Sequence, residues 1–169
     1  MIEAFIQAAQ RIPKLRLIML GDGYQRTLIH GLLANTGLEG RVHFAGIVAN
    51  ASLPDYYRSA DLYISASHSD GSSVSLLEAM ACGLPSLVSN IPGNMEWVTN
   101  GQTGWSFADG AVEGLAQGIF TAVQHRDDLK SMGQTARDVV EVRADWNKNF
   151  PKMIKAYQMA IAYANRDVR

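Results

Sequence analysis

The feature that most constrains the fold of this chain is a regular alternation of short apolar runs with longer segments of helical periodicity. The apolar runs have the length of single strands; they are residues 15–20, 42–44, 62–64 and 85–89. The helical segments repeat apolar residues every three or four positions; they are residues 2–9, 28–33, 74–81, 112–123, 129–140 and 153–164. Because strands that alternate with helices pack as βαβ units, the sequence predicts an α/β fold with a doubly wound parallel sheet flanked by helices.

Composition limits the chain to a few classes of protein. Its 169 residues correspond to one domain, and 15 Lys and Arg against 16 Asp and Glu give a net charge of −1. This balance speaks against a nucleic-acid partner, and the single cysteine, Cys82, excludes a disulfide scaffold or multi-cysteine zinc site. No apolar run is long enough for a membrane span, and the first residues lack the basic region of a signal peptide. We therefore expect one cytoplasmic domain over residues 1–169.

The last predicted elements are helices without intervening strands. On the final helix, which we place at residues 147–165, an apolar stripe is formed by Met153, Tyr157 and Ile161. Such a tail either covers a sheet face or reaches towards a partner, which can be another domain or a second copy of the chain in a homodimer.

A glycine-rich turn follows the first predicted strand. In Gly21-Asp22-Gly23 the missing side chains allow another group to approach the backbone, although such turns also use glycine for geometry alone. The turn is not a dinucleotide-binding fingerprint, because Arg26 stands where that pattern needs a small residue. Ligands of doubly wound sheets bind where strands end and helices begin, so the turn is a candidate binding loop.

A second candidate loop precedes the predicted helix at 74–81. Residues 69–73 read Ser-Asp-Gly-Ser-Ser, and their backbone N–H groups together with the helix dipole favour an anion. Each hydrogen bond to a charged oxygen contributes about 1.5–3 kcal/mol, so three of them can hold a diphosphate without Lys or Arg. The alternative is that Ser72 or Ser73 only caps the helix. The Walker A pattern is absent, which argues against ordinary NTPase chemistry.

Glu78 is an unusual residue for its position. It stands among Leu, Ala and Met residues, where a charge is costly unless paired, and it follows the anion loop by about one to two helical turns. A carboxylate there suits a pair of ribose hydroxyls; the alternative is an exposed glutamate on an otherwise buried helix. The histidines show no metal-ligand spacing, and Ser75 has no nucleophile-elbow sequence around it. We therefore expect neither a metal centre nor a hydrolase triad.

Residues 70–85, Asp-Gly-Ser-Ser-Val-Ser-Leu-Leu-Glu-Ala-Met-Ala-Cys-Gly-Leu-Pro, closely resemble the signature of retaining glycosyltransferases of family 4. In that signature two acids flank seven residues, and Ala-Met-Ala-x-Gly-x-Pro follows; the acids here are Asp70 and Glu78. Further landmarks of the family fall in its order at residues 17–23, 42–46, 60–67, 101–104 and 145–146. The resemblance covers nearly the whole chain, and its specificity lies in the combination of these pieces.

The resemblance implies a GT-B architecture, in which two Rossmann-like domains enclose a cleft, and it makes this chain the C-terminal, donor-binding domain. By position in the motif, Glu78 would bind the ribose hydroxyls of a nucleotide-sugar. Asp70, the residue implied as catalytic, would face the hydroxyls of the donor sugar. The other donor-binding residues implied are Gly21 and Gly23 close to the diphosphate, Gly71, Ser72, Ser73 and Val74 with their amides on it, and Gly46, Ile47 and Val48 at the base.

The reaction implied is transfer of a sugar from this donor to an acceptor with retention at the anomeric carbon, in polysaccharide, glycolipid or glycoconjugate synthesis. The nucleotide-sugar is a substrate, so no cofactor and no metal are expected, and protein groups would stabilise the leaving diphosphate. The residues do not specify the nucleotide, the sugar or the acceptor.

Two departures from the family pattern affect this interpretation. The first acid is usually Glu, and the shorter Asp70 loses about 1.5 Å of reach, one C–C bond, which points to a change of substrate rather than of fold. The resemblance also implies that the chain would begin after the family's first strand and its phosphate-gripping Arg and Lys, and that the N-terminal acceptor domain would lie outside it. We therefore expect the isolated chain to have weak donor affinity and no transferase activity.

Two other functions are compatible with the same pattern. One is a non-catalytic nucleotide-binding or partner module that kept the fold. The other is a different GT-B enzyme, such as a sugar-nucleotide epimerase or a phosphorylase-like enzyme, although the spacing from Asp70 to Glu78 favours family 4. Family members often act at a membrane surface, docked by the N-terminal domain, so peripheral association with the inner face of the membrane is a further expectation. The helix at 147–165 resembles the one that crosses back to that domain.

Overall fold

The structure is a computed structural model, and it describes residues 1–165. Its strands are β1 (Leu17–Leu20), β2 (Val42–Gly46), β3 (Tyr63–Ser65), β4 (Ser86–Ser89) and β5 (Gly104–Phe107). Its α-helices are α1 (Ile2–Arg11), α2 (Arg26–Leu33), α3 (Leu53–Ser59), α4 (Val74–Ala81), α5 (Pro92–Met95), α6 (Val112–Gln124), α7 (Leu129–Arg143) and α8 (Trp146–Ala164), and short 3-10 turns lie at Glu39–Arg41 and Asn50–Ser52. The predicted α/β class, with parallel strands flanked by helices, is confirmed.

The described strands form two parallel sheets instead of one continuous sheet. One sheet pairs β1 with β2, and the other has the order β3-β4-β5. β1 and β3 therefore each keep one unpaired edge, and a groove of about 830 Å³ is lined by residues of both strands. The difference is visible in burial: all of β4 is buried between two neighbours, whereas Ile18 and Leu20 of β1 are 39% and 37% exposed.

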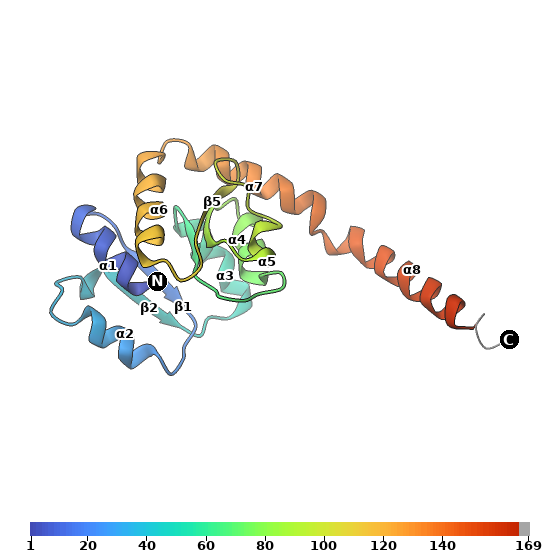
Figure 1. The fold of residues 1–169 in the computed structure, drawn as a ribbon, viewed down its shortest axis with the longest axis horizontal. Helices are drawn as coiled ribbons and strands as arrows, with labels where there is room; N and C mark the ends of the chain where they lie inside the picture. Colours follow the sequence, from blue (N-terminus) through green and yellow to red (C-terminus); the bar gives the residue numbers. More distant parts are fainter. Residues whose placement is uncertain (166–169) are drawn as a thin grey trace.

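Helix α1 joins the two sheets on one face. Its small residues Ala4 and Ala8 are fully buried against α6, which lies beside α1 in Figure 1, and against Leu87 of β4. Its other side packs on β2 and α2 in a second cluster; the buried members are Ile2, Phe5, Ala9, Leu33, Leu38 and Val42. Alanines at this contact let the helix backbones approach closely, so one amphipathic helix serves two separate cores.

The central strand β4 separates two further layers. Leu87 faces the α1 and α6 side, and the next residue, Val88, packs with the cluster of α4 and α7 on the opposite side. This alternation follows from the two-residue period of a strand. Both residues are fully buried, so β4 anchors the loops that leave the ends of the three-stranded sheet.

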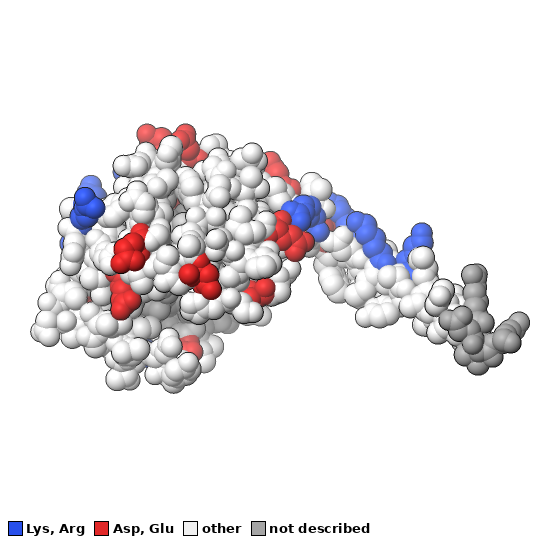
Figure 2. All heavy atoms as spheres, viewed as in Figure 1, with Lys and Arg blue, Asp and Glu red and all other residues white. Residues whose placement is uncertain are grey.

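Helix α8 leaves the body of the molecule and projects into solvent, as Figure 1 shows. None of its residues is buried, and Tyr157 and Ile161 are 61% and 63% exposed. Basic side chains form a row along it in Figure 2, where the sequence has Lys148, Lys152 and Lys155. Among the helices of residues 1–165, none is long and apolar enough to cross a membrane.

The strand β5 was not predicted, because residues 91–104 are rich in Gly and Asn and the strand has only four residues. The position of its first residue, Gly104, explains why a glycine stands there. A Cβ on Gly104 would overlap the carbonyl oxygen of Ser86 on the neighbouring strand and lie 2.8 Å from its backbone nitrogen. The glycine that resembles a turn signal is therefore required by close approach of two strands.

Candidate functional site

The loop 66–73 carries the first acid from β3 to α4. Asp70, Gly71 and Ser72 are exposed, whereas Ser73 is 5% exposed and its hydroxyl accepts a hydrogen bond from the Leu76 amide at 3.4 Å. The capping alternative is thus realised by Ser73. The amides of Gly71 and Ser72 remain on the surface at the start of α4, where the helix dipole favours negative charge.

A chain of hydroxyls supports the start of α4. Ser75 Oγ lies 3.2 Å from Ser73 Oγ and 2.8 Å from the hydroxyl of Tyr63 on β3. Val74, between these serines, is 68% exposed. No Lys or Arg occurs in residues 69–78, so an anion bound here would be held by backbone and hydroxyl groups.

Glu78 has a hydrogen-bond partner, Tyr57, which offsets the cost of a carboxylate among apolar neighbours. The hydroxyl of Tyr57 on α3 donates to Glu78 Oε2 at 3.1 Å, and Tyr57 itself is 7% exposed. Burial, reinforced by this hydrogen bond to a carboxylate, raises the pKa of Tyr57 well above its ordinary value. The tyrosine therefore stays a neutral donor and holds one carboxylate oxygen of Glu78.

An open groove of about 490 Å³ runs along the face of α4 that carries Glu78. Its other wall comes from the end of α7 and the start of α8. The polar side chains on that wall are Glu141, Asp145 and Lys148. Lys148 is the basic residue of this lining, and its Nζ lies 3.4 Å from Asp145 Oδ2. Asp145 also caps α8 by accepting from the Asn147 amide at 2.9 Å.

The turn after β1 and the end of β2 come together in space. The Gly21 amide donates to the Gly46 carbonyl at 2.8 Å, and both residues have positive φ, 95° and 68°, which explains glycine at these two places. Gly23 is exposed, its amide donates to the Asp22 carboxylate at 2.8 Å, and that carboxylate pairs with Arg26 at 3.3 Å. This turn lines a separate hollow of about 210 Å³.

The predicted site residues thus fall into two groups. Asp70, the amides that follow it and Glu78 lie together around α4, and Gly21, Gly23 and Gly46 lie together at the ends of β1 and β2. Ile47 is 88% exposed and Val48 is partly buried beyond the second group. β1 and β2 belong to one sheet, whereas the loop before α4 follows β3 of the other, and within residues 1–165 no hydrogen bond joins the two groups.

Sequence reasoning missed two residues of these groups. The sequence does not single out Tyr57, because nothing in its pattern links this residue to an acid 21 positions later. Arg26 served only to exclude a fingerprint, yet it places a guanidinium beside the Gly21–Gly23 turn and 5.7 Å from the centre of the Phe44 ring. Among residues 1–165, no group of three or more His, Cys, Asp or Glu residues is placed to hold a metal ion.

Comparison with known families decides the assignment. Residues 1–139 match the family described as glycosyl transferases group 1, which is most of the chain. The chain belongs to this family. It is 29% identical over 139 residues to N-acetyl-alpha-D-glucosaminyl L-malate synthase of Bacillus anthracis, covering 82% of this chain and 36% of that protein. It is 31% identical over 142 residues to D-inositol 3-phosphate glycosyltransferase of Gordonia bronchialis, covering 83% of this chain and 31% of that protein.

Solved structures give the same fold for this group 1 chain. Sucrose-phosphate synthase from Thermosynechococcus elongatus superposes with a TM-score of 0.84 at 27% identity, covering 96% of this chain and 42% of that one. Anabaena HepE in complex with UDP-glucose superposes with a TM-score of 0.83 at 25% identity, covering 94% and 44%. These neighbours are GT-B glycosyltransferases, which confirms the predicted fold. The group 1 chain spans less than half the length of each relative named here.

Proposed function

We propose that this chain binds the nucleotide-sugar donor of a retaining glycosyltransferase of family 4. The observation that carries the proposal is the arrangement around α4. Asp70 and the exposed residues Gly71 and Ser72 stand before its first turn, and Glu78 stands in its second turn on an open groove. The UDP-glucose bound to HepE supports a uridine nucleotide as the donor class to test first.

The chemistry of each group fits one part of such a donor. Amides at a helix N-terminus suit the diphosphate, and a carboxylate suits the paired hydroxyls of ribose. Tyr57 leaves one oxygen of Glu78 free to accept from a ribose hydroxyl while it fixes the other. Asp70 is exposed beside the amides, where its carboxylate would face the donor sugar. In this proposal the backbone of Gly46, Ile47 and Val48 meets the base, and no cofactor or metal takes part.

Two features of the chain favour a donor-binding part of a larger enzyme. The unpaired edges of β1 and β3 face a common groove, and an added parallel strand there would give both edges hydrogen-bond partners. The exposed apolar stripe of Tyr157 and Ile161 on α8 would be covered by an acceptor-binding domain. We therefore propose that the isolated chain transfers no sugar, and detection of transfer by the purified chain would contradict this.

The nucleotide-binding proposal is tested by saturation-transfer NMR of the chain with UDP, GDP and ADP, which detects millimolar affinities. We expect the strongest ribose and base signals from UDP. Glu78→Ala should weaken affinity about tenfold or more, the equivalent of one charge-assisted hydrogen bond. Glu113→Ala, which removes an exposed glutamate in the first turn of α6, is the matched control.

Two outcomes would reject the proposal. The first is equal affinity of wild type and Glu78→Ala, which would remove the ribose assignment. The second is the absence of signal from every nucleotide, which would leave the chain as a partner module of the same fold. Loss of signal in Glu113→Ala would show a general effect of removing acidic charge.

A further inference from the structure

The corner between β4 and α5 lies directly under the loop 66–73. Gly93, the second residue of α5, is buried, and a Cβ placed on it would overlap the carbonyl oxygen of Gly71 and lie 2.5 Å from that of Asp70. The obstructing atoms belong to backbone, which cannot rotate aside as the tip of a side chain can. The absence of a side chain at residue 93 therefore sets how deeply the Asp70–Gly71 backbone can settle against the protein.

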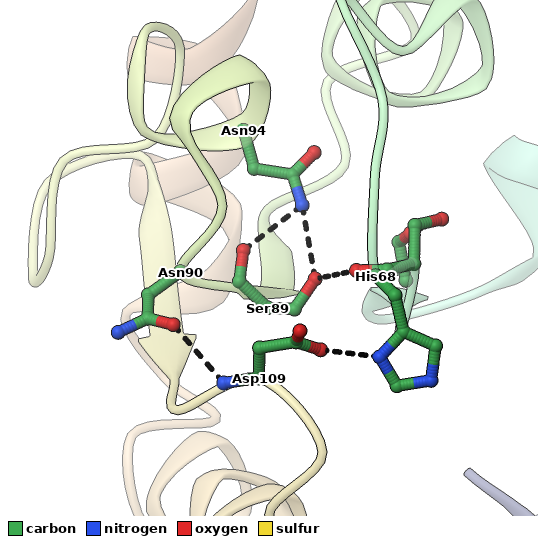
Figure 3. A network of polar contacts seen from close by, with 7 residues as sticks. His68, Ser89, Asn90, Asn94 and Asp109 are labelled. Carbon is green, nitrogen blue, oxygen red and sulfur yellow. Dashed lines mark hydrogen bonds and ion pairs between the residues drawn. The ribbon is translucent and has the colours of Figure 1, made fainter.

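Ser89, the last residue of β4, ties the beginning of the same loop. Its hydroxyl donates to the Ser67 carbonyl at 2.5 Å, and Asn94 Nδ2 donates to the Ser89 carbonyl at 2.9 Å and lies 3.3 Å from its hydroxyl. Figure 3 shows Ser89 between Asn94 and the loop backbone next to His68. Ser89 and Asn94 are both fully buried. Asn94 Oδ1 has no hydrogen-bond partner among residues 1–165, so the side chain acts here through its donor.

A second tie holds the outer flank of the loop. His68 Nδ1 lies 2.7 Å from Asp109 Oδ1, and the Asp109 amide donates to Asn90 Oδ1 at 3.0 Å (Figure 3). These contacts run through surface residues, whereas those of Ser89 and Gly93 are buried. The loop is thus fixed at Ser67 and at Asp70–Gly71 from below, and at His68 from the side.

We propose that Ser89 and Gly93 are positioning residues for the donor site. Together they hold the loop 66–73 in the position in which the Asp70 carboxylate and the Gly71 and Ser72 amides can contact the donor. The inference about the loop's position rests on the geometry of the β4–α5 corner. The consequence for a donor sugar rests also on the function proposed above.

The chain provides a matched control within the same strand. Ser86 of β4 is as fully buried as Ser89, but its hydroxyl has no hydrogen-bond partner among the described residues. Ser89→Ala and Ser86→Ala therefore remove the same atom from the same strand, and only the first releases the loop. Gly31 of α2 is exposed with nothing within 4 Å of an added Cβ, so Gly31→Ala is the control for Gly93→Ala.

Amide hydrogen exchange of the free chain tests the positioning role without any ligand. We expect Ser89→Ala and Gly93→Ala to speed exchange about tenfold in peptides covering residues 66–76 and to leave the β1–β2 peptides unchanged. Ser86→Ala and Gly31→Ala should leave both regions unchanged. Unchanged exchange in residues 66–76 of Ser89→Ala would overturn the proposal, and so would an equal increase over the whole chain, which is the signature of general destabilisation. If Gly93→Ala does not fold, the pair of serine variants decides.

The consequence for the donor is tested by comparing UDP-glucose with UDP. Because Asp70 faces the sugar in the proposed function, Ser89→Ala should lower the affinity for UDP-glucose at least about threefold relative to that for UDP, and Ser86→Ala should keep the wild-type ratio. An unchanged ratio in Ser89→Ala would refute the role in sugar binding. If wild type binds neither compound, the proposed function fails, while the exchange measurement still decides whether the corner positions the loop.

Discussion

The pairing of Tyr57 with Glu78 gives the most direct quantitative prediction. Tyr57→Phe keeps the ring, which lies edge-on to the Tyr63 ring with 6.4 Å between the two ring centroids. The substitution removes the hydroxyl that donates to Glu78 at 3.1 Å. A hydrogen bond to a charged group contributes about 1.5–3 kcal/mol, and because Glu78 is only partly buried we expect a loss of about 1–2 kcal/mol at pH 7. In a domain of this size that lowers Tm by about 2–6 °C.

The pH dependence of this loss makes the prediction specific. The folded state holds the Tyr57 pKa far above the value of about 10 that tyrosine has in an unfolded chain. Above pH 10 the phenol of Tyr57 ionises in the unfolded state and stays neutral in the folded state. This residue therefore lowers the free energy of unfolding of wild type by about 1.4 kcal/mol at pH 11. Tyr57→Phe cannot lose this contribution. The difference between the two proteins should therefore shrink towards zero between pH 9 and pH 11.

The assay is urea unfolding of wild type, Tyr57→Phe and Tyr24→Phe at pH 7, 9, 10 and 11, followed by circular dichroism. Tyr24 is 94% exposed, so Tyr24→Phe removes a phenol that makes no buried contact and should follow wild type at each pH. A difference between wild type and Tyr57→Phe that stays constant from pH 9 to pH 11 would refute the reasoning, because it would mean that Tyr57 titrates equally in both states.

Three further predictions concern the scaffold. Leu87→Ala should cost about 2–5 kcal/mol in urea unfolding, because Leu87 is fully buried in the central strand; a loss below about 1 kcal/mol would contradict its core position. Gly133→Ala should destabilise by about 1–3 kcal/mol, since its Cβ would overlap the Gly83 carbonyl oxygen, whereas Gly31→Ala should be neutral or slightly stabilising; equal Tm values for these variants would argue against the α7 contact. Deletion of residues 146–169 should leave the Tm of the body within about 4 °C, as α8 has no buried residue, and a larger decrease would show that α8 is held to the body.

Much of the candidate site could be predicted because its signals are local. The eight-residue spacing from Asp70 to Glu78 and the Ser-rich approach to α4 lie within one loop and one helix. Hydrophobic periodicity also depends only on residues close together in the sequence. The alternation of strand-length apolar runs with helical segments therefore predicted the α/β class and the positions of β1 to β4 within a few residues. β5 was not predicted because glycine at its first position, Gly104, is required by the close approach of the neighbouring strand β4 and not by the sequence around it.

The sequence by itself determined the class of fold, the place of the acid loop and the family, because each depends on residue types at short, fixed spacings. Only the tertiary structure decided that Tyr57 holds Glu78, that Ser89 and Gly93 seat the loop of Asp70, and that β1 and β3 face a groove instead of a strand. Each of these facts joins residues about 20 or more positions apart. Their contact is set by how helices and sheets pack, and packing leaves no period or motif in the chain.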